Sequence, residues 1–140
     1  MPDQPCVFCR IISRELPSSV VYEDETVLAF MDIQPATPGH ALVVPKRHSP
    51  GLEDVNESDG AAMFMAAQRV AAAIRRSTIP CEGVNLFFAD GEAALQEVFH
   101  AHLHVIPRNP QDGFRIEAKW SEPPRDVLDA RAVEVSANLL

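Results

Sequence analysis

The chain has 140 residues, of which 46% are hydrophobic and 23% charged, as expected for one globular domain with its own core. Its formal net charge of −8 and the lack of a basic stripe argue against a nucleic-acid partner. No apolar run approaches the about 20 residues that span a bilayer. The N-terminus MPDQPCVFCR lacks the apolar segment of a signal peptide. We therefore expect a cytoplasmic protein without a membrane partner.

The first half of the chain predicts one short helix and three strands. Residues 6–15 are expected to form a helix or turn with four inward-facing side chains, those of Val7, Phe8, Ile11 and Ile12. Strands are expected over residues 20–23, 26–31 and 40–45, with the turn cluster PATPG before the third.

The second half predicts one long helix and two further strands. Residues 61–76 have apolar side chains spaced by three and four, which indicates an amphipathic helix. Residues 84–89 form the fourth strand, and residues 125–139 have the composition of a terminal helix. Several strands around one long helix indicate an α+β fold with an antiparallel sheet.

The stretch HAHLHV places His100, His102 and His104 at alternate positions. Because side chains alternate across a strand, we expect the three imidazoles on one face of a strand that ends before Pro107. Such a row has three readings. It is a solvated strand face, or it chelates a catalytic metal, or one imidazole attacks an electrophile while its neighbours orient it.

The three cysteines include a C-x2-C pair, Cys6 and Cys9. An odd number of cysteines in a reducing compartment does not predict a disulfide framework. The pair alone has two readings: free thiols near a terminus, or half of a zinc site that needs two further ligands.

HAHLHV resembles the His-x-His-x-His signature of the histidine-triad (HIT) superfamily of nucleotide hydrolases and transferases. The segment from CVFCRIISRELP to GHALVVPKRH also resembles the N-terminal half of that family. The resemblance covers about residues 6–108 of a single domain spanning 1–140, and residues 109–140 are an extension that it does not explain. It implies a HIT-like fold, with an antiparallel sheet, one long helix and a short N-terminal helix, that pairs as a homodimer.

The resemblance also implies a reaction at phosphorus. His102 would attack the α-phosphorus of a purine nucleoside monophosphate ester, amide or anhydride, an AMP-X compound, and a covalent nucleotidyl-histidine would follow. His104 would donate to the phosphoryl oxygens, and His40 would support the site. An imidazole suits this role because it is a neutral nucleophile near pH 7.

Four further positions match binding residues of the family. Asp32 corresponds to the acid that accepts hydrogen bonds from the ribose, and Gln96 to a glutamine that contacts phosphate. Ile33 and Leu42 correspond to the lining of the base pocket, although ordinary core packing would also explain them.

The resemblance brings the cysteine pair together with two histidines. Cys6, Cys9, His48 and His100 match the ligands of a structural zinc in a bacterial-type branch of the family. Two thiolates and two imidazoles close a tetrahedral site. No cofactor is then expected in the chemical step.

The loop before the histidines departs from the family pattern. Ala89 replaces an Asn, Leu95 a Gly and Glu97 a hydroxyl residue. In the family, the lost Asn and hydroxyl normally contact the phosphate or leaving group, so the sequence leaves an alternative open: a nucleotide-binding or interaction protein with little or no turnover.

Overall fold

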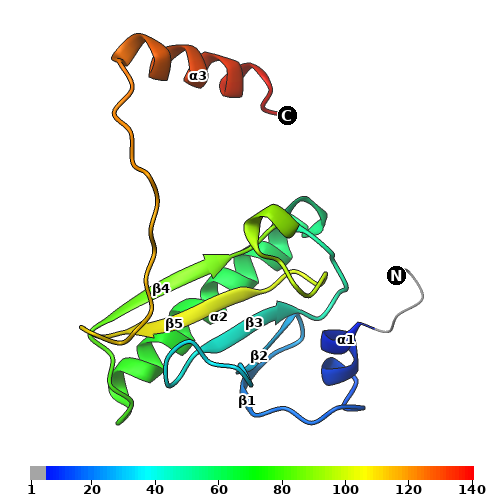
Figure 1. The fold of residues 1–140 in the computed structure, drawn as a ribbon. Coiled ribbons are helices and arrows are strands. Elements are labelled where there is room, and N and C mark those ends of the chain that lie inside the picture. Colours follow the sequence, from blue (N-terminus) through cyan, green and yellow to red (C-terminus); the bar gives the residue numbers. More distant parts are fainter. Residues whose placement is uncertain (1–5) are drawn as a thin grey trace.

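The fold is an open antiparallel sheet in a computed structural model that describes residues 6–140 (Figure 1). Its strands are β1 (Val20–Glu23), β2 (Val27–Met31), β3 (Ala41–Pro45), β4 (Gly83–Phe88) and β5 (Leu103–Arg108). Their order is β1-β2-β3-β5-β4, and every neighbouring pair is antiparallel. The α+β prediction is therefore confirmed. The prediction that no signal peptide begins the chain involves residues 1–5, which lie outside the described part.

The long helix α2 (Glu57–Arg76) covers one face of the sheet. It begins four residues before the predicted Ala61, because the Asn56 side chain accepts the backbone N–H of Asp59 at 2.8 Å and caps the helix at that point. Its buried side chains include Met63 and Val70, which pack against strand residues such as Val43. This layer forms the main core.

The short helix α1 (Val7–Ile12) lies against the other face of the sheet. Phe8 and Ile11, three positions apart, pack with Leu28 and Leu42. The prediction that Val7 also packs inward is wrong, since Val7 is 40% exposed. A helix of six residues has only one side against the sheet, and Phe8 and Ile11 occupy it.

Strand β5 differs from its prediction at both ends. It begins at Leu103, so His100 and His102 precede it, and it continues through Pro107 to Arg108. Pro107 is tolerated because its carbonyl accepts the Thr37 hydroxyl at 2.7 Å and therefore points away from β4. Its nitrogen faces the same side, and β3 has already ended there, at the pair Ala41 with Val105.

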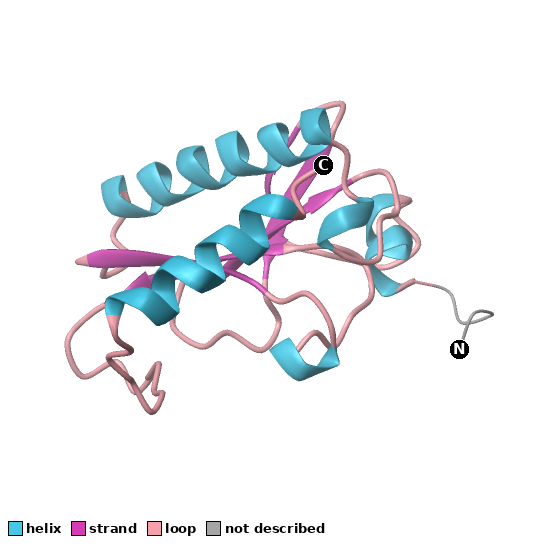
Figure 2. Cartoon of the chain, turned by 90° about the horizontal axis from the view of Figure 1, so that it is seen from above, coloured by secondary structure: helices cyan, strands magenta, loops and turns pink. Residues whose placement is uncertain are grey.

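An extended segment carries the chain from β5 to the terminal helix α3 (Arg125–Ala137) (Figures 1 and 2). Two short 3-10 helices, Leu52–Asp54 and Glu92–Ala94, lie in the other connections. Among residues 6–140, every helix is too short or too polar to cross a lipid bilayer.

Candidate functional site

All five histidines and Phe8 form a row of rings on the α1 side of the sheet. Successive ring centroids are 5.0 Å apart for His48–His100, 5.9 Å for His100–Phe8, 5.1 Å for Phe8–His102, 5.0 Å for His102–His104 and 5.1 Å for His104–His40. The three histidines of HAHLHV thus share a face, although only His104 belongs to β5. The two ends of the row have different neighbours: cysteines at one end and Asp32 at the other.

His102 occupies the middle of the row and is 6% exposed. Its Nδ1–H donates to the His100 carbonyl at 2.7 Å, so its Nε2 carries the free lone pair. The edge-on Phe8 ring, at an interplanar angle of 83°, holds the imidazole from the α1 side. Burial lowers the pKa of His102, while the bond to the His100 carbonyl opposes that shift. The ring is therefore neutral at pH 7 and has an unprotonated nitrogen.

The tautomers of His40 and His104 follow from one backbone bond. The Ala36 N–H donates to His40 Nδ1 at 3.0 Å, so the hydrogen of neutral His40 lies on Nε2. That N–H donates to His104 Nδ1 at 2.8 Å, and the hydrogen of His104 must then lie on Nε2. Burial lowers the pKa of His104 to about 4, helped by His102 and His40, which keeps the ring neutral. His104 can therefore donate from Nε2 to an acceptor.

Asp32 lies beside this pair. One of its oxygens is 3.5 Å from His40 Nε2, and the other accepts the Gln34 N–H at 2.8 Å. Asp32, His40 and His104 have the residue types of a metal site. The Ala36 bond argues against that use, because His40 Nε2 carries a hydrogen and has no lone pair for a metal. The catalytic-metal reading is thereby disfavoured.

A second cluster joins α1 to the strands at the other end of the row. Cys6 Sγ lies 3.3 Å from His100 Nδ1, Cys9 Sγ lies 3.4 Å from His48 Nδ1, and the two Nδ1 atoms are 3.2 Å apart. Tetrahedral zinc with ordinary bond lengths separates sulfur from nitrogen by about 3.6 Å and nitrogen from nitrogen by about 3.3 Å. The four side chains therefore have the spacing of a closed zinc site.

The protonation chemistry of this cluster also fits a cation. His100 is fully buried and donates Nε2–H to the Pro45 carbonyl at 2.7 Å, which aims the Nδ1 lone pair at the sulfurs. Burial, followed by the bond and charge of Cys6, raises the pKa of the Cys9 thiol to about 11. A thiolate at this position needs a positive ion, and the set Cys6, Cys9, His48 and His100 would hold zinc.

The remaining predicted site residues differ in how far their side chains are buried. Leu42 is 5% exposed and packs in the α1 core, whereas Ile33 is 96% exposed. The Gln96 amide donates to the carbonyls of Pro50 and Val98 and accepts the Gly91 N–H. Both amide hydrogens are thus engaged by backbone, and the phosphate contact of Gln96 stays a prediction.

The loop before the histidines explains one departure from the family pattern. Leu95 has φ +73°, the left-handed region in which glycine has no steric cost, and its side chain is 76% exposed. Ala89 is buried, while Glu97 is exposed. Backbone geometry therefore favours a glycine at position 95. Leu95 in its place lowers the stability of the fold, but no side-chain contact is lost, because glycine has no side chain.

Sequence reasoning missed two groups of the site. Phe8 was expected only as a core residue, but it contacts the rings of both His100 and His102. Its position between Cys6 and Cys9 was the sequence feature that could have predicted its place in the site. The Ala36 N–H, which orients His40, has no side-chain signal at all.

These features define a class: an α+β protein whose sheet presents a neutral, oriented imidazole beside a second imidazole donor. The chain belongs to the HIT domain family, whose model matches residues 13–111. It is 38% identical over 138 residues to the adenosine 5'-monophosphoramidase HNT1 of Saccharomyces cerevisiae, covering 98% of this chain and 84% of the relative.

Two solved structures of the family resemble the whole chain. A HIT family member from Bacillus subtilis superposes with TM-score 0.88 at 37% identity, covering 98% of this chain and 99% of the other. A zinc-bound histidine-triad protein from Mycobacterium smegmatis gives TM-score 0.75 at 39% identity, covering 96% and 97%.

Proposed function

We propose that this chain is a nucleotide hydrolase that cleaves the bond between the α-phosphorus and the leaving group of a purine nucleoside monophosphate ester, amide or anhydride. The observation that carries the proposal is the 2.7 Å bond from His102 Nδ1–H to the His100 carbonyl, which leaves Nε2 free to attack. The relative from Saccharomyces cerevisiae is named for the hydrolysis of an AMP amide, which supports this substrate class.

The proposed reaction has two displacements. His102 Nε2 forms a bond to the phosphorus as the bond to the leaving group breaks, which gives a nucleotidyl-histidine. The leaving group departs with a proton from solvent. Water then attacks the phosphorus as the bond to His102 Nε2 breaks, the proton of the water returns to solvent, and His102 regains its starting tautomer. His104 Nε2–H donates a hydrogen bond to a phosphoryl oxygen and stabilises its charge in both transition states. His40 fixes the tautomer of His104, and Asp32 binds the ribose.

Zinc has a structural role in this proposal. Cys6, Cys9, His48 and His100 would hold it, and the zinc-bound relative from Mycobacterium smegmatis supports the presence of the metal in the family. A closed set of four protein ligands leaves no position for substrate. The metal would tie α1 to the strands and thereby hold Phe8 against His102.

The proposed active unit is a cytoplasmic homodimer. Within residues 6–140, β4 is an edge strand whose one partner is β5, and it carries Leu86 and Phe87, which are 39% and 37% exposed. An edge strand with exposed apolar side chains is stabilised by pairing with another chain. A second copy supplies such a strand.

The experiment is hydrolysis of an AMP-linked fluorogenic phosphoramidate by the wild type and by His102→Ala. Turnover is expected only in the wild type, with a nucleotide mass on the peptide that contains His102 after rapid quenching. Retained turnover in His102→Ala, or an adduct on another residue, would overturn the mechanism. Nucleotide binding without turnover in the wild type would favour the alternative, a binding protein, to which the exposed Glu97 and the absent family hydroxyl point.

A further inference from the structure

The turn of residues 36–40, which leads into β3, orients His40 through both its ring and its backbone. The Ala36 N–H donates to His40 Nδ1 at 3.0 Å, and the His40 N–H donates to the Thr37 carbonyl at 3.1 Å. Thr37 and His40 are both buried, at 3% and 5% exposure. The tautomer of His40 therefore depends on whatever keeps residues 36 and 37 in place.

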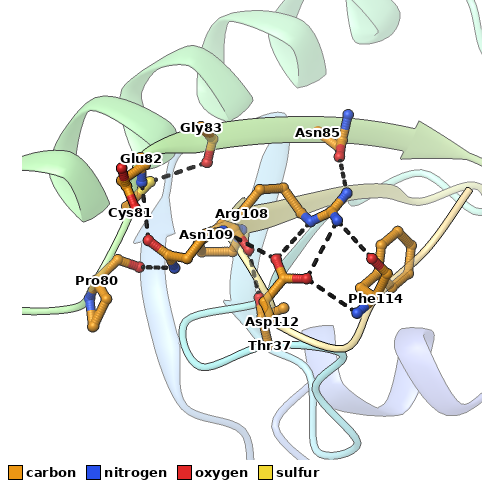
Figure 3. Close-up of polar contacts among 11 residues, drawn as sticks. Thr37, Pro80, Cys81, Glu82, Gly83, Asn85, Arg108, Asn109, Asp112 and Phe114 are labelled. Carbon is orange, nitrogen blue, oxygen red and sulfur yellow. Dashed lines mark hydrogen bonds and ion pairs between the residues drawn. The ribbon is translucent and has the colours of Figure 1, made fainter.

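The Thr37 side chain ties this turn to the end of β5 (Figure 3). Its hydroxyl donates to the Pro107 carbonyl at 2.7 Å. β3 begins only at Ala41, opposite Val105, so this carbonyl lies beyond the pairing of β3 with β5. Pro38 has no N–H to offer, and the Thr37 hydroxyl takes the place of a strand donor. Because a buried carbonyl without a donor is costly, this bond restrains both segments.

Gly39 brings the same turn into direct contact with the Pro107 ring. Its φ is +91°, and a Cβ at this position would lie 3.3 Å from Pro107 Cγ and 3.0 Å from Ile79 Cγ2. These distances are shorter than ordinary van der Waals contact, so the backbone of the turn lies directly on the proline. Residues on both sides of Pro38 are thus held against the end of β5.

The end of β5 is itself braced from the opposite side (Figure 3). Arg108 donates to Asn85 of β4 at 2.6 Å, to Asp112 at 2.8 Å and to the Phe114 carbonyl at 2.7 Å. Asp112 in turn accepts the N–H groups of Asn109 and Phe114. The carbonyl that accepts from Thr37 therefore belongs to a strand end with little freedom to move.

These contacts form a closed ring that begins and ends at His104. Pro107 lies three residues after His104 on β5 and accepts the Thr37 hydroxyl. The neighbouring Ala36 N–H holds His40, and His40 Nε2 donates back to His104 Nδ1 at 2.8 Å. The strand that carries His104 thus also anchors the turn that selects its tautomer.

We propose that Thr37 is a positioning residue, which acts through the Ala36 N–H and His40 on the tautomer of His104. Without its hydroxyl the turn would relax, and His40 would no longer be held to one tautomer. His104 Nε2 would then lack its hydrogen in part of the molecules, and a phosphoryl oxygen would lose its donor. The consequence for turnover rests on the proposed function, whereas the effect on the two imidazoles does not.

Nitrogen-15 NMR of the histidine rings tests this role directly, because ring nitrogens with and without a hydrogen have well-separated shifts. The full chain is purified with zinc and measured at neutral pH. We expect the hydrogen of wild-type His104 on Nε2. Thr37→Val keeps the shape of the side chain without its donor, and both His104 nitrogens should shift toward the average of the two tautomers. Thr37→Ser keeps the hydroxyl and should keep the wild-type shifts.

Two results of the NMR experiment would overturn the proposal. One is a wild-type His104 with its hydrogen on Nδ1, and the other is a set of unchanged shifts in Thr37→Val. Thr37→Ala also removes the hydroxyl and leaves room at the carbonyl for water, so it replaces the valine variant if that variant does not fold.

Kinetics on the AMP phosphoramidate connects the tautomer to turnover. Thr37→Val should lower kcat about threefold or more with a smaller change in KM, and Thr37→Ser should restore kcat. Val70→Ala is the control, because Val70 is buried under α2 on the other face of the sheet. It should lower the melting temperature but keep the wild-type shifts and kcat. An equal loss of kcat in Val70→Ala would show a general effect of stability and contradict the role of Thr37. If the wild type itself does not turn over, the proposed function fails, while the ring shifts still decide the role of Thr37.

Discussion

His40 Nε2 donates to His104 Nδ1 at 2.8 Å, and His40 is itself oriented by the backbone N–H of Ala36, which donates to its Nδ1. The bond selects the His104 tautomer with its hydrogen on Nε2. A neutral imidazole without such a partner exchanges between two tautomers, of which only one has its hydrogen on Nε2. The pair therefore couples the loop before β3 to the imidazole that donates to the phosphoryl oxygen in the proposed reaction.

His40→Phe should lower kcat about 10-fold or more with a smaller change in KM. The variant keeps the volume of the buried ring but removes the donor to His104, and a misdirected oxyanion donor costs the transition state more than the ground state. Steady-state kinetics on an AMP phosphoramidate measures the effect. Asp32→Ala is the comparison and should mainly raise KM, because the ribose contacts proposed for Asp32 would be formed in both the ground state and the transition state. An unchanged kcat in His40→Phe would refute the relay.

Cys9→Ser should lose the zinc, whereas Cys81→Ser should keep about one zinc per chain. Both residues are half-buried cysteines, but only Cys9 belongs to the Cys6–Cys9–His48–His100 cluster. Because metal binding is coupled to folding, loss of zinc should also lower the melting temperature. Metal analysis and thermal unfolding of the two variants measure these effects. Equal zinc content in both would contradict the assigned ligands.

The free energy of unfolding should decrease as the pH falls. The pKa of His104 is lowered from 6.5 to about 4 in the folded chain, chiefly by burial. The unfolded chain binds its proton below about pH 6.5, while the folded chain stays neutral, so stability present above that pH is lost progressively down to about pH 4. Urea unfolding across this range measures the slope. His104→Gln should make the slope shallower, and an identical slope would show that His104 does not contribute.

Leu95→Gly should stabilise the chain by about 0.5–1 kcal/mol. A left-handed conformation costs a non-glycine residue about 1–2 kcal/mol, which exceeds the entropy that glycine adds to the unfolded state. The Leu95 side chain is 76% exposed, so little burial is lost. Urea unfolding measures the gain. Ala94→Gly is the control: Ala94 is exposed and lies in the 3-10 helix with negative φ, so this change should destabilise.

Much of this protein was determined by short-range patterns that the sequence displays directly. The continuous apolar run in residues 40–45 predicted β3, because a strand covered on both faces is apolar throughout, and spacing by three and four in residues 61–76 predicted α2, because burial on one side of a helix imposes that period. The family, and with it the expected roles of His102 and the cysteine pair, followed from motifs whose residue types are required by chemistry.

Element boundaries and hydrogen-bond directions depended on the tertiary structure. Pro107 belongs to a strand because β3 ends before reaching it, a fact that no local pattern contains. The free nitrogen of His102 is set by the carbonyl of His100, and that of His100 by the carbonyl of Pro45. Backbone groups are the same in every residue, so the sequence cannot show which carbonyl meets which imidazole; only the packing of distant segments decides it.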